Sequence, residues 1–167
     1  MANRILIVGC PGSGKSTMAR AISEKTGIPV VHLDQLFWRD NWASVPAEEF
    51  DALLRIELAK DEWIIDGNFS RTLEMRLERA DTVIWLDYPM LVSLFGALRR
   101  VLGNYGKVRP DMGPNCPERL NWPFLKAIFL FRRRNSKKME RLLVPRPGCE
   151  IVRLRSRSQA RRFLKTF

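Results

Sequence analysis

The sequence predicts an α/β fold in which helices cover a parallel β-sheet. Short apolar runs alternate with helical segments along the 167 residues, which is the pattern of crossover connections between parallel strands. A glycine-rich loop follows the first apolar run, and an aspartate follows three of the others, at Asp34, Asp66 and Asp87. Because the carboxyl ends of parallel strands share one edge of the sheet, these polar groups should converge there. The length favours a single domain over residues 1–167.

The composition is that of a globular chain, with 46% hydrophobic and 28% charged residues. Three cysteines without a Cys-x-x-Cys pair, together with one histidine, His32, argue against a structural zinc site. No apolar run approaches the roughly 18 residues of an integral membrane segment, and residues 5–8 are too short a run for a signal peptide. We therefore expect a cytoplasmic protein of a reducing compartment.

The first predicted unit is a strand ending at residues 5–8, a glycine loop over 9–14 and a helix over 15–26. The continuous run Ile-Leu-Ile-Val is typical of a buried parallel strand. Gly27 ends the helix and Pro29 reinforces the stop, while the inward face of the helix carries Met18, Ala19 and Ile22.

The remaining elements follow from the same patterns. Further strands are expected at 29–33, 63–65, 82–86 and 150–154, and further helices at 46–60, 70–79, 89–102, 121–143 and 158–165. Ser70 suits the N-cap of its helix because a hydroxyl there accepts from a backbone amide. Residues 103–118 contain three glycines and three prolines, so this stretch is predicted to be a loop.

Residues 9–16, Gly-Cys-Pro-Gly-Ser-Gly-Lys-Ser, match the phosphate-binding P-loop pattern GxxxxGK[ST]. Glycines let backbone amides turn toward phosphates, and the helix N-terminus adds partial positive charge at the same place. Lys15 should reach the β- and γ-phosphates of ATP, and the Ser16 hydroxyl can ligate Mg²⁺. We interpret Cys10 as a small residue that fits this loop rather than as a redox switch. The predicted nucleotide-binding residues here are Gly9, Pro11, Gly12, Ser13, Gly14, Lys15, Ser16 and Thr17.

The charge is distributed unevenly along the chain. Residues 1–90 carry a net charge of −4, whereas residues 91–167 carry +15. Such a field attracts polyanions, whether nucleotide phosphates, nucleic acid or anionic lipid. A basic cluster in the predicted helix over 121–143 admits three interpretations: a polyanion-binding surface, a face attracted to an anionic membrane, or a solvated helix. Its members are Arg132, Arg133, Arg134, Lys137, Lys138 and Arg141.

Together the motifs resemble the adenylate-kinase-like P-loop kinases and, more narrowly, the group labelled DNA topology modulation proteins. The resemblance rests on the P-loop, Val-His-Leu-Asp34, Trp-Ile-Ile-Asp66-Gly-Asn-Phe-Ser-Arg71 and Ile-Trp-Leu-Asp87-Tyr-Pro, and on Arg-Pro-Asp-Met at 109–112. It implies a three-layer, nucleoside-monophosphate-kinase-like fold with a five-stranded parallel sheet in the order 2-3-1-4-5. It also implies ATP with Mg²⁺ and a mobile lid that carries arginines.

The resemblance assigns roles to individual positions. Asp66 matches the aspartate that orders Mg²⁺ beside the P-loop, and Asp34 stands where related kinases place an acceptor-binding acid; a turn cap is the alternative for Asp34. Arg71 matches the arginine that holds an acceptor phosphate, or else is a solvated residue. The lid should span about 103–120, with Arg99 and Arg109 closing on the transferred phosphoryl group. Arg155 would lie against the adenine.

The sequence thus predicts a kinase that moves the ATP γ-phosphoryl group to a small-molecule or nucleotide acceptor. The chain is short for a motor and has no Asn-Lys-x-Asp guanine signature. The predicted catalytic residues are Lys15, Asp34, Asp66, Arg99 and Arg109, with Ser16 and Asp66 at the metal. The alternative is a nucleic-acid-binding protein whose binding is gated by nucleotide. The acceptor and the oligomeric state stay open.

Overall fold

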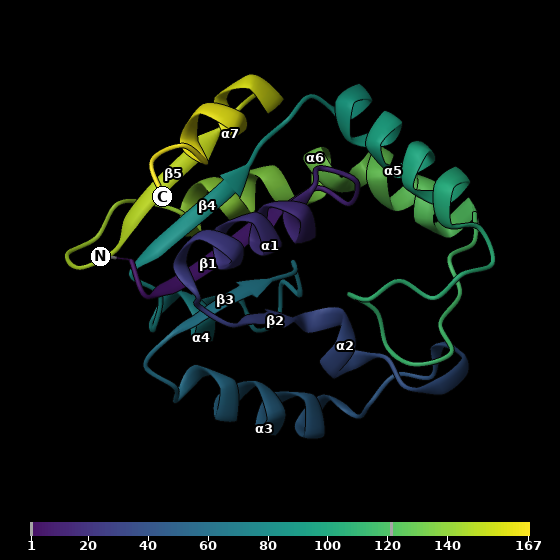
Figure 1. Ribbon diagram of the computed structural model, residues 1–167, viewed down its shortest axis with the longest axis horizontal. Helices are drawn as coiled ribbons and strands as arrows, with labels where there is room; N and C mark the ends of the chain where they lie inside the picture. The colour runs from purple at the N-terminus through teal and green to yellow at the C-terminus, as the bar shows by residue number, and fades with distance from the viewer. Residues whose placement is uncertain (1, 121) are drawn as a thin grey trace.

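The computed structural model describes residues 2–120 and 122–167, without the side chains of Arg132, Arg133, Arg134 and Ser136. Five strands form one parallel sheet in the order β2-β3-β1-β4-β5, with helices on both faces (Figure 1). This arrangement confirms the predicted α/β fold and the strand order. The strands are β1 Arg4–Gly9, β2 Val30–His32, β3 Trp63–Asp66, β4 Thr82–Leu86 and β5 Glu150–Leu154.

Seven α-helices and one 3₁₀ turn, Asp40–Trp42, are present among the described residues. The helices are α1 Lys15–Thr26, α2 Leu33–Phe37, α3 Ala47–Leu58, α4 Leu73–Leu77, α5 Met90–Asn104, α6 Trp122–Leu142 and α7 Arg157–Phe163. Asn121, where the sixth predicted helix begins, lies outside the described residues.

The central strand β1 is buried on both faces and divides the apolar core in two. Leu6 and Val8 pack on the side that holds α3 and the C-terminal part of α6. Ile5 and Ile7 pack on the side that holds α1 and α7. The buried face of α1 is Met18, Ala19 and Ile22, as its periodicity predicts. The continuous apolar run of β1 is therefore explained by helices on both sides.

Two predicted boundaries are wrong. Strand β2 ends at His32, so Leu33 and Asp34 belong to α2; Leu33 is buried, and Asp34 occupies the first helical turn, where a carboxylate is favoured. Ser70 is not an N-cap, because α4 begins at Leu73 with Thr72 at its cap. Residues 67–70 form an irregular turn instead, with positive φ at Gly67 and Phe69.

The loop predicted over residues 103–118 begins two residues later, because α5 continues through Gly103 and Asn104. Residues 105–120 form a loop without a helix, which we call the crossing loop. The loop crosses to the segment around α2 (Figure 1). The Gln35 side chain donates to the Pro110 carbonyl at 2.5 Å, and the Cys116 thiol lies 3.2 Å from the Arg39 carbonyl oxygen. The loop therefore joins α5 on one side of the sheet edge to α2 on the other.

The P-loop backbone rests directly on α5. A Cβ on Gly12 would lie 2.2 Å from the Ser93 carbonyl oxygen, and a Cβ on Gly96 would lie 2.1 Å from the Gly12 carbonyl oxygen. Neither position has room for a side chain, so two glycines set the separation of loop and helix.

We predict that Gly96→Ala destabilises the fold by about 1–3 kcal/mol, because the added methyl group must push two backbone segments apart. Gly103→Ala is the matched control on the same helix, where a Cβ would meet nothing within 4 Å. That control should be neutral or stabilise by up to about 1 kcal/mol, since alanine is the better helix former. Chemical denaturation measures both, and equal effects of the two substitutions would contradict the proposed crowding.

Candidate active site

Lys15 is folded back over the P-loop. Its Nζ donates to the carbonyl oxygens of Gly9 and Cys10 at 3.1 and 3.3 Å. Burial lowers the pKa of the Lys15 ammonium, while the nearby carboxylates of Asp66 and Asp34 oppose that shift. The lysine therefore lies between the loop and two carboxylates, Asp66 at the end of β3 and Asp34 in the first turn of α2.

Asn68 clamps the start of the P-loop. Its side-chain amide donates to the Gly9 carbonyl oxygen at 2.7 Å and accepts from the Gly9 amide at 3.1 Å. These two bonds continue the pairing of β1 with β3 beyond Asp66, where the backbone of β3 turns away. Sequence reasoning missed this role, because no periodicity marks a side chain that replaces a strand neighbour.

Asp66 and His32 form a buried pair at the sheet edge. The His32 Nδ1 and Asp66 Oδ1 atoms lie 2.9 Å apart. The parallel register of β2 and β3 places these two residues opposite each other. The second carboxylate oxygen of Asp66 is buried and has no hydrogen-bond partner among the described residues.

Asp34 is half-buried and belongs to the same acidic group. Burial raises the pKa of its carboxyl, and the charges of Asp66 and Asp111 raise it further, while Lys15 and Arg109 act in the opposite direction. The structure thus brings together the predicted residues Lys15, Asp34 and Asp66. Within residues 2–120 and 122–167 there is no ready-made metal cluster of three His, Cys, Asp or Glu side chains.

A charged network fixes the crossing loop to α5 and to the P-loop. Arg109 pairs with Asp111 at 2.5 Å and with Glu118 at 2.6 Å, and Arg100 of α5 pairs with Glu118 at 3.0 Å. Burial alone would raise the pKa of Asp111, but Arg109 and a hydrogen bond with the Ser16 hydroxyl hold it below its usual value. Asp111 therefore stands at the Ser16 hydroxyl, a contact that sequence reasoning missed.

A cleft of about 1020 Å³ opens along the P-loop, α5, the crossing loop and α7. Its size suits a nucleotide-sized ligand. Arg99 and Arg109 line it, as do Arg157 and Arg161 of α7. Arg155 does not line the cleft; it is exposed, and its backbone amide donates to the Gln159 side chain at 2.6 Å. The cations on this wall therefore come from the helix that follows Arg155.

Of the P-loop residues predicted to bind nucleotide, six line the cleft: Gly12, Ser13, Gly14, Lys15, Ser16 and Thr17.

Two arginines after β3 have opposite environments. Arg71 is exposed and forms a two-pronged ion pair with Asp51 of α3, with both contacts at 2.7 Å. Arg76 is completely buried and donates to the carbonyl oxygens of Gly67, Asn68 and Phe69 at 2.8, 2.5 and 2.9 Å. Burial lowers its pKa to about 9. Arg76 thus holds the turn that presents Asn68 to the P-loop.

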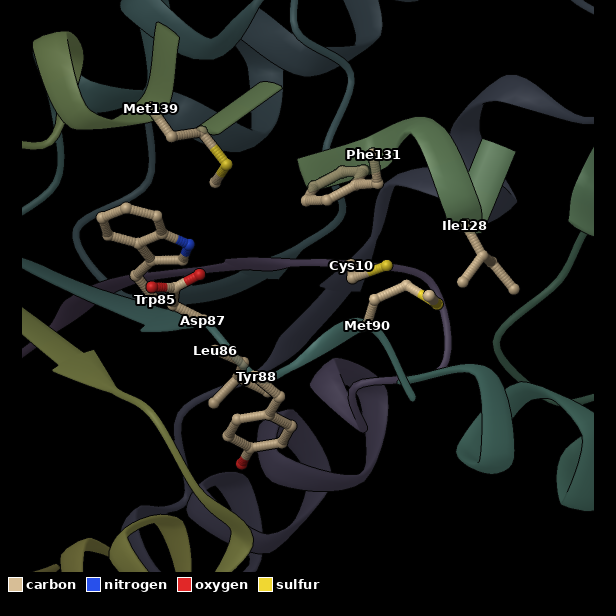
Figure 2. A pocket seen from close by; sticks show the side chains of 9 residues that line it. All are labelled: Cys10, Trp85, Leu86, Asp87, Tyr88, Met90, Ile128, Phe131 and Met139. Atoms are coloured by element: carbon tan, nitrogen blue, oxygen red, sulfur yellow. The ribbon is translucent and has the colours of Figure 1, made fainter. Parts of the chain in front are cut away.

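A second, much smaller crevice of about 10 Å³ lies behind the P-loop at Cys10 (Figure 2). The Cys10 side chain points toward Ile128 of α6 and packs with Ile128 and Ala97, and Phe131 packs against the same cluster. Burial raises the pKa of the Cys10 thiol, although Lys15 and Ser93 partly oppose this. A raised pKa disfavours the reactive thiolate, in keeping with a packing role. Asp87, also at this crevice, pairs with Arg153 at 2.6 Å.

Comparisons with known proteins identify relatives of this chain. A family model described as an AAA domain matches residues 5–90. An adenylate kinase of Mycobacterium leprae (strain Br4923) is 32% identical over 126 residues, covering 60% of this chain and 69% of that relative. An adenylate kinase of Listeria monocytogenes serotype 4a (strain HCC23) is 32% identical over 95 residues, covering 45% and 44% of the two chains.

Solved structures show the same fold. A shikimate kinase from Acinetobacter baumannii in complex with shikimate has a TM-score of 0.64 and 15% identity, covering 98% of this chain and 89% of that one. A shikimate kinase from Bacteroides thetaiotaomicron has a TM-score of 0.55 and 15% identity, covering 99% and 96%. At this identity the likeness speaks to the fold alone.

We predict that Arg76→Met destabilises the protein by about 3 kcal/mol, because it leaves several buried carbonyl groups without a donor. The matched control is Arg71→Met, which removes an exposed ion pair and should leave the unfolding midpoint close to that of the unchanged protein. Urea denaturation of both variants tests this. A large loss in the control, or none in Arg76→Met, would overturn the structural role given to Arg76.

Proposed function

Because the chain belongs to the AAA domain family, among the P-loop kinases related to adenylate kinase, we propose that it is an Mg-ATP-dependent phosphotransferase. It would move the ATP γ-phosphoryl group to a small-molecule or nucleotide acceptor. The observation that carries this proposal is the gathering of Asp34 and Asp66 beside Lys15 at the P-loop. A protein that only binds phosphates needs no carboxylates there, whereas phosphoryl transfer needs a cation site and an acceptor base.

The P-loop amides and Lys15 would hold the phosphates of ATP. The arginines along the cleft, Arg99, Arg109, Arg157 and Arg161, are placed to stabilise negative charge on the phosphoryl oxygens. Their number fits a nucleotide carrying several phosphate charges.

The residues present also fit Mg²⁺. The buried oxygen of Asp66, which has no hydrogen-bond partner in the described part of the chain, and the Ser16 hydroxyl are hard oxygen ligands next to the P-loop. Mg²⁺ in nucleotide sites takes only one or two protein oxygens, because phosphates and water complete its shell, so a cluster of three acids is not required. When bound, the ion neutralises charge on the β- and γ-phosphates.

Asp34 would accept the proton of the acceptor hydroxyl. Its raised pKa makes it a stronger base than an exposed aspartate, and its place beside Lys15 sets it near the phosphate end of the nucleotide. The acceptor itself follows from none of these contacts.

Gly103 and Asn104 of the predicted lid belong to α5. Residues 105–120 would act as the lid of this single domain. Their contacts reach Arg100 on one side and Gln35 on the other, so opening the loop exposes the nucleotide side and the acceptor side together. The Asp111 carboxylate is hydrogen-bonded to the Ser16 hydroxyl, and its negative charge repels phosphates. Binding of Mg-ATP would therefore require the Asp111 side chain to move away from Ser16.

The nucleic-acid alternative and the narrower resemblance to topology modulation proteins have less support. The nucleic-acid alternative rests on the +15 net charge of residues 91–167, and the side chains of Arg132, Arg133 and Arg134 in that stretch lie outside the described residues. The comparisons name no topology modulation protein among the relatives reported above. The named relatives are kinases.

The deciding experiment mixes the protein with Mg-ATP and a panel of nucleoside monophosphates, nucleosides and hydroxylated metabolites, and records ADP formation above the background without acceptor. We expect one class of acceptor to stimulate turnover. Asp34→Asn should lower that turnover by about a hundredfold or more while ATP still binds, since only the base is lost. Lys15→Ala should weaken both ATP binding and turnover. Failure of the protein to bind Mg-ATP, with no effect of Lys15→Ala, would refute the proposal.

A second prediction concerns the lid. Asp111→Asn should strengthen Mg-ATP binding roughly fivefold, because it removes one negative charge that competes with the phosphates at Ser16. Glu118→Gln is the matched control, since it loosens Arg100 and Arg109 but leaves the Asp111 carboxylate in place. Isothermal titration calorimetry measures both. Weaker binding in Asp111→Asn would show that this carboxylate helps to hold the bound cation and does not compete with it.

A further inference from the structure

The outward face of α5 is apolar. Leu91, Phe95 and Leu102 are 61%, 73% and 81% exposed, and their spacing of four and seven residues aligns them along one side of the helix. The opposite side packs inward through Ser93, Ala97 and Val101. A surface helix ordinarily turns polar residues toward water on that outer side, so this stripe is unusual for a surface in contact with water alone.

Further large aromatic side chains are exposed beyond the end of α5. Tyr105 is exposed, and the pairing of Tyr105 with Glu118 brings the return of the loop back to this point. Trp122 follows a few residues later at the start of α6 and is also exposed. Helices α5 and α6 lie side by side at this end of the molecule (Figure 1). We call Leu91, Phe95, Leu102, Tyr105 and Trp122 the apolar strip.

The surroundings of the apolar strip are strongly cationic. No acidic residue occurs between Asp87 and Asp111 or between Glu118 and Glu140. Asp111 and Glu118 are buried in ion pairs with Arg109 and Arg100, so they do not offset the exposed cations. Lys126 and Lys137 are exposed on α6. Large exposed apolar side chains and exposed lysines therefore occur together on two neighbouring helices, α5 and α6.

We propose that α5 and α6 dock the protein on an anionic lipid bilayer, with the apolar strip in the headgroup region. Leucine and phenylalanine supply the buried apolar area, tryptophan and tyrosine favour the interface, and lysines attract anionic headgroups. No helix in the described ranges is long and apolar enough to cross a membrane, so the contact is peripheral.

Charge complementarity selects this occupant over two others. In a symmetric dimer through the same face, the lysines of one copy would meet those of the other and repel. A nucleic acid would engage the cations, but it offers no apolar surface to cover leucines and phenylalanine. An anionic bilayer offers an apolar region to the apolar strip and anionic headgroups to the lysines.

The test is flotation of the full chain with vesicles of phosphatidylcholine alone or with roughly one third phosphatidylglycerol. The protein should float with the anionic vesicles and not with the neutral ones, and binding should weaken as salt is added. The double variant Phe95→Ser, Leu102→Ser should bind about tenfold more weakly or worse, since the apolar contribution is lost. Ile56→Ser on α3 is its control, because Ile56 is an exposed apolar residue on a different helix and should have no effect.

Further variants test the contribution of the lysines and identify the part of the protein that contacts the lipid. Lys126→Gln with Lys137→Gln should weaken binding roughly twentyfold, at about fivefold for each positive charge removed, whereas Lys165→Gln beyond α7 should not. Anionic vesicles should shift the tryptophan emission to shorter wavelength, and Trp122→Phe should remove that shift.

Several results would overturn the proposal. These are equal binding to neutral vesicles, binding that survives Phe95→Ser with Leu102→Ser, or an emission shift that persists in Trp122→Phe. A dimer in sedimentation that this double variant dissociates would assign the face to a second copy. Retention on duplex DNA without vesicle binding would assign it to nucleic acid. Nucleotide binding and phosphoryl transfer are separate readouts, so the outcome here does not depend on them.

Discussion

The direct contact between the P-loop backbone and α5 governs the arrangement of this molecule. Gly12 and Gly96 let two backbones meet without a side chain between them, so the height of the loop above the sheet edge is set by α5 itself. Lys15 is positioned from that loop, and Arg99 and Arg100 are presented from that helix. The same packing commits the small residues Ser93 and Ala97 to the interior and leaves the larger ones of α5 on the outside.

Charge balance organises the rest of the site. Lys15, Arg100 and Arg109 lie among Asp34, Asp66, Asp111 and Glu118 in a partly buried cluster along the cleft. Burial lowers the pKa of Lys15 and raises that of Asp34, so each group is converted to its uncharged form more easily than it would be in water. A ligand that brings several negative charges together with a cation changes this balance more than an uncharged ligand of the same size.

Periodicity and motif predicted the sheet, the P-loop and the buried face of α1, because each depends on local sequence. The pairing of His32 with Asp66 depends on strand register, which local sequence does not give. The resemblance indicated Arg71, which lies on the surface, and no sequence pattern indicated Arg76, which is buried. Asp111 and Glu118 lie in a loop, where no repeating pattern indicates which side chains turn inward.

The small cluster of Cys10, Ala97 and Ile128 joins the P-loop, α5 and α6 in one packed contact. Interdigitated side chains have little room to move independently, so a shift of one of these three segments displaces the other two with it. Any partner that repositions α6 must therefore act on the nucleotide loop as well. Thermodynamic reciprocity makes that influence mutual: the free energy by which such a partner alters nucleotide affinity equals the free energy by which nucleotide alters the affinity for that partner.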